Sequence, residues 1–153
     1  MKRPFLAATI LVMCLSAVLW CGCGTTTQGA TSPSAANTGP GNTGDAALAR
    51  AFSEHAWGLE VEGEGTVSKL LADDTTGDRH QRFIVRLASG QTLLIAHNVD
   101  VAPRVDSLQV GDTVSFKGDY EWNDQGGLVH WTHRDPDGRH PAGWIKRGGR
   151  TYQ

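Results

Sequence analysis

Apolar and polar side chains alternate with a period of two along much of the sequence, and this pattern constrains the fold most. The clearest example is "VSFKGDYEW" (residues 114–122), where polar residues separate valine, phenylalanine, tyrosine and tryptophan. Successive side chains of a β-strand point to opposite faces of the sheet, so this pattern predicts a strand with one buried face. The same reasoning predicts five strands, at residues 57–67, 82–87, 92–98, 114–122 and 127–133.

The spacing of these strands predicts a small barrel. Five short strands with a longer connection between the third and fourth are the layout of an OB-like Greek-key barrel. That connection, residues 98–112, has room for one short helical turn that ends at Gly111. Gly63 and Gly65 permit the sharp coiling that the first strand of a small barrel needs. We therefore expect a mostly β domain built as an OB-like barrel; another small sandwich or an SH3-like barrel is the alternative.

A short helix is predicted before the first strand. Asp45 is a good N-cap residue, alanines follow it, and Gly58 is suited to stop the helix. Leu48 and Phe52 are four residues apart and form an apolar stripe. The globular domain is therefore expected to span residues 45–153.

Residues 1–23 have the layout of a secretory signal peptide. Lys2 and Arg3 precede an apolar run at residues 5–20, which is somewhat short for a membrane span of about 20 residues. A retained N-terminal anchor helix is the alternative. Residues 24–44 contain no charged, aromatic or large aliphatic side chain, so they are predicted to be a disordered linker.

The end of the signal resembles the lipobox of bacterial lipoproteins, in which a small residue precedes a lipid-modified cysteine. Gly22 precedes Cys23, and Gly24 follows it where an aspartate would retain a lipoprotein at the inner membrane. We therefore expect an exported protein held in the cell envelope by a lipid on Cys23, as an outer-membrane lipoprotein facing the periplasm. Plain secretion is the alternative. All three cysteines lie within residues 1–23, so no disulfide is expected in the domain.

The net charge argues against a nucleic-acid partner. The formal net charge of the whole chain is −2, and removal of Lys2 and Arg3 makes it two units more negative. A protein that follows a phosphate backbone needs a basic face, so nucleic acid is an unlikely ligand. The membrane, through Cys23, is the expected partner, and a protein or small-molecule ligand is left unidentified.

The segment "VHWTHRDPDGRH" (residues 129–140) contains three histidines and one tryptophan. On a strand, His130 and His133 point to opposite faces, so they are not expected to bind one metal ion unless the strand bends. The candidate metal ligands are therefore His133, Asp135 and His140, in and beyond the strand end. The alternative is a strand end whose histidines cap loop carbonyls and whose tryptophans seal the barrel.

Several other polar residues are candidates for a site, because strand ends lie close together in a small barrel. The catalytic candidates are His97, Asp100, His130, His133 and Asp135. The candidate ligand contacts are Arg82, Arg86 and Arg104, which could hold an anion, and Trp131. Asp73, Asp74 and Asp78 could bind calcium. In each case a turn residue, a surface ion pair or a buried histidine bonded to the backbone is the alternative.

Three stretches of the sequence match a known family. "DDTTGDRHQRFIVRLASGQTLLIAHNVDVAPRV", "GDYEWNDQGGLVHWTHRDPDGRHPAGWI" and the closing "YQ" resemble the small bacterial envelope proteins known as domain of unknown function 3465. The resemblance runs over residues 61–153. It implies a location in the envelope, and it implies no activity.

The sequence leaves two functions open. It contains no nucleophile elbow, P-loop, HExxH or CxxC motif, which weighs against the common hydrolases and redox enzymes. We expect a binding module for a partner or small ligand. The alternative is a metal-dependent, nuclease-like hydrolase that uses the histidines and aspartates, an idea that rests on fold analogy alone.

Overall fold

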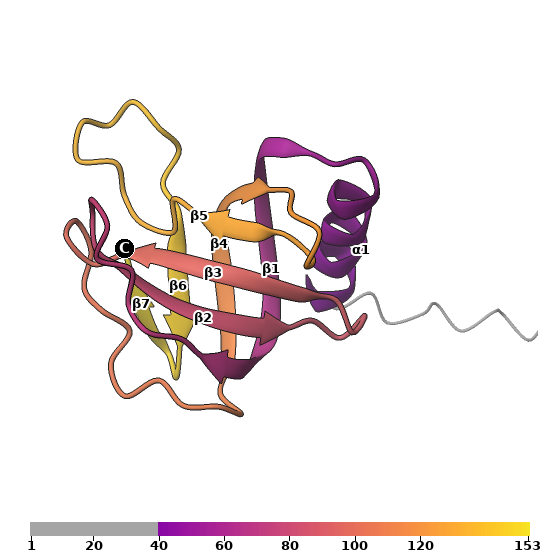
Figure 1. Cartoon of the computed structure of the whole chain (residues 1–153), viewed down its shortest axis with the longest axis horizontal. Helices are drawn as coiled ribbons and strands as arrows, with labels where there is room; N and C mark the ends of the chain where they lie inside the picture. The colour runs from indigo at the N-terminus through magenta and orange to yellow at the C-terminus, as the bar shows by residue number, and fades with distance from the viewer. Residues whose placement is uncertain (1–39) are drawn as a thin grey trace, which may run out of the picture. The chain divides into compact units, whose positions relative to one another are not determined.

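The computed structural model describes residues 40–153, with side chains from residue 43 onward (Figure 1). Its elements are α1 (Pro40–Ser53), β1 (Trp57–Leu70), β2 (His80–Arg86), β3 (Thr92–Asn98), β4 (Thr113–Glu121), β5 (Leu128–His130), β6 (Trp144–Arg147) and β7 (Arg150–Tyr152). The predicted mostly β architecture with one short helix is confirmed. The predicted signal peptide, Cys23 and residues 24–39 of the predicted linker lie outside the described residues. Within residues 40–153, no helix has the length and apolar character that a membrane span requires.

Five strands close into the predicted OB-like barrel. Their order is β1–β2–β3–β5–β4, and β4 pairs with β1 to close the ring. Neighbouring strands are antiparallel, except that β3 and β5 are parallel. The long connection between β3 and β4 makes this order possible, because it carries the chain across the barrel from β3 to the far side of β5. As a result, β2, β3 and β5 lie side by side on one face (Figure 1).

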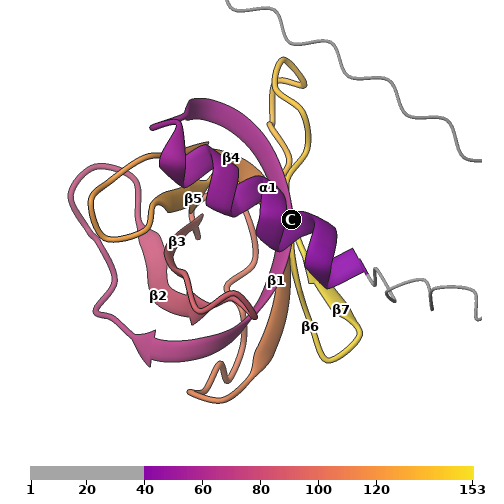
Figure 2. The ribbon, with the colours of Figure 1, turned by 90° about the vertical axis from the view of Figure 1, so that its right-hand side faces the viewer.

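One end of the barrel is covered by α1 (Figure 2). Leu48 and Ala51 of this helix are buried in the core. A Cβ atom on Gly63 of β1 would lie 2.8 Å from the Phe116 ring and 2.9 Å from Leu48, so only glycine lets the helix pack this closely. The predicted role of Gly63 in coiling the strand therefore includes making room for the helix.

The helix begins at Pro40, so the prediction that Asp45 is its N-cap is wrong. Proline is favoured at the first position of a helix, where no backbone N–H is needed. Asp45 lies further along, only 6% exposed, and its Oδ2 accepts a hydrogen bond of 2.8 Å from the Ser89 amide. The helix ends at Ser53, before the predicted stop at Gly58, because His55 adopts the left-handed conformation (φ 52°).

The helical turn predicted between the third and fourth strands is absent from the described residues. Residues 99–112 form turns, and Val105 and Leu108 are buried beneath them. The Gln81 side chain fixes this segment, since its amide donates to the Val105 carbonyl (3.1 Å) and accepts from the Val105 N–H (2.9 Å). Pro103 disfavours a helical conformation in the residue before it, which explains why a turn is preferred here.

The chain ends in a β-hairpin that the alternation did not predict. β5 is shorter than expected, and along β4 it reaches only residues 119–121. The earlier residues on the same edge of β4, 115–117, therefore pair with β6. β7 then pairs with β6 through a turn at Gly148 and Gly149, both with positive φ. Ile145 and Tyr152 complete the core. Each of these strands is too short for an alternating pattern to stand out.

Candidate functional site

The outer face of β2, β3 and β5 carries an apolar row. Ile84 lies opposite Leu94, and Leu94 lies opposite Leu128, so the three side chains cross three neighbouring strands. All three point away from the core, because the alternate positions in these strands are the buried ones, and each is only partly covered. Apolar side chains on the outer face of a sheet leave a surface that a ligand can cover.

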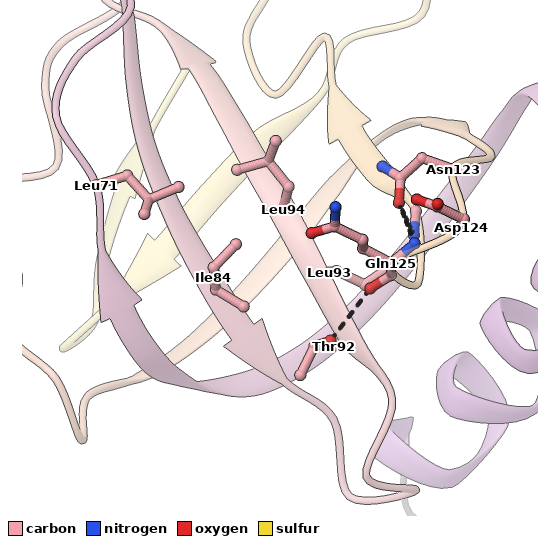
Figure 3. A pocket seen from close by; sticks show the side chains of 9 residues that line it. Leu71, Ile84, Thr92, Leu93, Leu94, Asn123, Asp124 and Gln125 are labelled. Carbon is pink, nitrogen blue, oxygen red and sulfur yellow. Dashed lines mark hydrogen bonds between the residues drawn. The ribbon is translucent and has the colours of Figure 1, made fainter.

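Two loops flank this row and, together with Ile84 and Leu94, form a cavity of about 420 Å³ (Figure 3). On one side is Leu71, where the β1–β2 loop begins. On the other side is the β4–β5 loop, residues 122–127, with Asn123, Asp124 and Gln125 at the cavity wall. We call this the apolar cavity. Strands two and three with these two loops form the surface through which OB-folds bind their ligands.

The β4–β5 loop is held in one conformation by its own hydrogen bonds. The Asn123 side chain accepts from the amides of Gln125 (2.9 Å) and Gly127 (3.1 Å). The Thr92 hydroxyl donates to the Gln125 carbonyl (3.3 Å), which ties the loop to β3 (Figure 3). Gly126 and Gly127 have φ values of 115° and 108°, which favour glycine. The wall of the apolar cavity is therefore preformed.

Two of the three arginines predicted to bind an anion are paired with carboxylates. Arg104 makes two hydrogen bonds with Asp73 (2.6 and 3.0 Å), and these hold the pKa of that carboxyl below its usual value. Arg82 donates to the Ala72 carbonyl (3.1 Å) and lies 3.6 Å from Asp74. The structure does not bring the two guanidinium groups together on an open surface; each one fastens the β1–β2 loop. Arg86 is exposed, and its guanidinium is 3.5 Å from the Gly90 carbonyl.

A second cavity, of about 270 Å³, lies near the other end of the same face. Its polar walls come from Asp78, His80, Asn98, His130 and His133. Trp131, Val101 and Pro136 complete the lining. We call this the histidine cavity. His80 of β2 lies opposite Asn98 of β3, and both are two residues from the row that contains Arg82 and Ala96.

The condition under which His130 and His133 were expected to point apart, one continuous strand, does not hold. β5 ends at His130, and Trp131 has φ 51°, so the alternation of a strand stops there. The chain turns, and both histidines line the histidine cavity. A bend in the strand was the stated exception to this expectation. Its position was not predictable, because a tryptophan in a sequence does not indicate a left-handed backbone.

His97 lies in the core, away from both cavities. It is fully buried, with its Nε2 3.0 Å from the Pro103 carbonyl and its Nδ1 2.9 Å from the Thr132 hydroxyl. Since a carbonyl can only accept, Nε2 carries the proton and Nδ1 accepts from Thr132. Asp100, its neighbour in the sequence, is fastened to Arg79 by side-chain and backbone hydrogen bonds of 2.7 Å.

The side chains of His133, Asp135 and His140 do not share a hydrogen-bond partner. The Asp135 carboxylate accepts the amides of Asp137, Arg139 and His140, and these bonds lower its pKa. The His140 Nε2 is 2.8 Å from Asp119, and its ring stacks on Trp131 with the centroids 4.2 Å apart. Across the described part of the chain, no group of three or more His, Cys, Asp or Glu side chains is arranged to hold a metal ion.

Sequence reasoning missed His80 and the apolar row. The predicted strand began at Arg82, whereas β2 begins two residues earlier, at His80. Extending the alternation backward by two residues would have placed His80 on the outer face, beside Arg82. Ile84, Leu94 and Leu128 looked like ordinary strand residues. Their alignment depends on the register between strands, which the sequence does not display.

The comparisons with known proteins give a family and no activity. The family model described as "Protein of unknown function (DUF3465)" matches residues 31–153. A search of the curated proteins found no match.

Proposed function

From the premise that the chain belongs to the DUF3465 family of proteins of unknown function, we propose that it is a binding module. Its ligand surface is the outer face of β2, β3 and β5, and its ligand is a peptide segment of a protein partner that inserts an apolar side chain into the apolar cavity. The observation that carries this proposal is the row of Ile84, Leu94 and Leu128 between two loops.

Three features support a peptide over other ligands. One side of the cavity is formed by the aliphatic side chains of Leu71, Ile84 and Leu94, which match an apolar side chain better than the charged phosphate backbone of a nucleic acid. Its rim offers the amide and carboxylate groups of Asn123, Asp124 and Gln125 for hydrogen bonds to a peptide. The preformed loop reduces the entropy lost on binding. The hydrolase that the sequence left open has no supporting observation among the described residues.

A displayed library of random peptides, selected on the purified protein, tests this proposal. Peptides that share an apolar residue should be enriched. Leu94→Glu should lower their affinity at least about tenfold, because it places an unpaired charge in the apolar cavity. The matched control is Thr66→Glu, which adds the same charge at an exposed position of β1. Peptides that bind equally well after Leu94→Glu, or are equally weakened by Thr66→Glu, would contradict the proposal.

A further inference from the structure

The histidine cavity is lined by imidazoles that each have one ring nitrogen already engaged. The Nδ1 atoms of His80 and His133 are each 2.8 Å from a backbone carbonyl, of Asp78 and Arg134 respectively. The His130 Nε2 is 3.0 Å from Glu121. The engaged nitrogens of His80 and His133 donate, since carbonyls accept. In a neutral imidazole the second nitrogen is then an acceptor.

These second nitrogens are available to a ligand. Among residues 43–153, neither the Nε2 atoms of His80 and His133 nor the Nδ1 of His130 has a hydrogen-bond partner. The rings cannot readily exchange donor for acceptor, because their other nitrogen is held by an oxygen atom. The cavity therefore presents several acceptors at once.

Asp78 adds a negative charge to the same cavity. Three neighbouring carboxylates each have an arginine partner; these pairs are Arg104–Asp73, Arg82–Asp74 and Arg79–Asp100. Asp78 has no ion-pair partner in the described part of the chain, and its closest polar contact is the Asn98 amide at 3.4 Å. Asp78 therefore differs from these three aspartates, because no arginine or lysine of the described residues forms an ion pair with its carboxylate.

We propose that the histidine cavity binds a cationic group with N–H donors, such as the ammonium of a lysine side chain. This inference rests on the proposed function, since the ligand is the same peptide lying along the same face. An ammonium has three donors and no acceptor, which matches a cavity lined by imidazole acceptors and one free carboxylate. The site thus selects a basic residue in addition to the apolar one.

The separation of the two cavities sets the spacing in the ligand. Ile84 and His80 are four residues apart on β2, a distance of roughly 13 Å at about 3.3 Å per residue. An extended peptide has nearly the same rise, so its apolar and basic residues should also be four positions apart. The preferred ligand is therefore an extended segment with an apolar residue at i and a lysine at i+4 or i−4.

Two pairs of synthetic peptides test this inference by calorimetry or NMR titration in the presence of EDTA. One pair is acetyl-Leu-Ser-Ser-Ser-Lys-amide and the same peptide with norleucine in place of lysine; the other pair has the reverse order. In at least one order, the lysine peptide should bind about tenfold more tightly than its norleucine counterpart. Asp78→Asn should abolish that preference. Asp124→Asn, which removes an equal charge at the apolar cavity, should leave it unchanged.

The outcomes separate the inference from the proposed function. Equal affinity of lysine and norleucine peptides, with both weakened by Leu94→Glu, would overturn the cationic subsite and leave the apolar one standing. Lysine peptides that bind as tightly to Leu94→Glu as to the unaltered protein, and still more tightly than norleucine peptides, would contradict the apolar cavity and support the cationic one. Failure of all four peptides to bind at millimolar concentration, or a requirement for added Zn²⁺, would overturn the inference. Long-range ¹H–¹⁵N spectra of the imidazoles confirm that the variants keep the fold.

Discussion

At the scale of single residues, histidine serves two purposes in this protein, and its side of the strand decides which. His97 points into the barrel, where both ring nitrogens are bonded and water is excluded. His80 and His130 point outward, with one nitrogen each left for a ligand. The same side chain is thus a structural element in one place and a binding group in the other.

The buried His97 makes stability depend on pH. Burial lowers its pKa, and the nearby His133 adds to this effect, although the bonds to Pro103 and Thr132 oppose it. A histidine whose pKa is lowered on folding contributes stability that is present above its unfolded value of 6.5 and is lost as the pH falls through the folded value. We expect urea unfolding at about pH 7.5 and about pH 5.5 to show this loss, and His97→Gln to reduce it. At the higher pH, His97→Gln should cost about 1–3 kcal/mol.

His140 provides a control with the opposite sign. Burial alone would lower its pKa, but the Pro141 carbonyl and the Asp119 carboxylate raise it above the usual value. Its stabilising effect is therefore present below pH 6.5 and is lost as the pH rises through the folded value. His140→Gln should make the loss of stability in acid steeper. If His97→Gln leaves the acid dependence unchanged, His97 is not its cause.

Single residues could be predicted from the sequence only where their role is local. Asp100 and Asp135 were recognisable as turn formers as well as site candidates, and in the structure both accept backbone amides. The partners of Arg82 and Arg104 depend on how loops far apart in sequence meet. For that reason the sequence suggested an anion site where the structure has ion pairs.

At the scale of secondary structure, the length of β5 determines how the chain ends. Five strands were predictable because alternation persists for several residues in most of them. The structure after Gly127 was not predictable. Trp131 has a left-handed backbone conformation, which shortens β5 and leaves the edge of β4 free to pair with the hairpin β6–β7. Tryptophan is not among the residues that favour turns, so the turn at Trp131 has no signal in the sequence.

The hairpin should contribute strongly to stability although its strands are short. Ile145 of β6 is fully buried and belongs to the core. Ile145→Ala removes three methyl or methylene groups from a packed interior, so the free energy of unfolding should fall by about 2–4 kcal/mol. Thr151→Ala on β7, an exposed position, should change it by less than about 0.5 kcal/mol. Chemical denaturation measures both; equal effects would mean that the hairpin is not part of the cooperative unit.

At the scale of the whole molecule, the proposed binding face and the N-terminal helix occupy different parts of the barrel. The apolar and histidine cavities are formed by strands and loops of the barrel, while α1 covers an end of it. The helix begins at Pro40, so it includes residues 40–44 of the predicted linker.

The lipid anchor that the sequence predicts on Cys23 can be tested by substitution. A thioether-linked lipid requires the cysteine sulfur, so Cys23→Ser should move the protein from the membrane fraction to the soluble envelope fraction while the barrel stays folded. Two acyl chains are enough for stable anchoring, and a protein without them has no comparable attachment. Cys14→Ser and Cys21→Ser are matched controls within the same segment and should leave fractionation unchanged. Labelling with a radioactive fatty acid should follow the same pattern. Membrane attachment that persists in Cys23→Ser, with no label incorporated by the unaltered protein, would show that a retained apolar segment holds the protein instead.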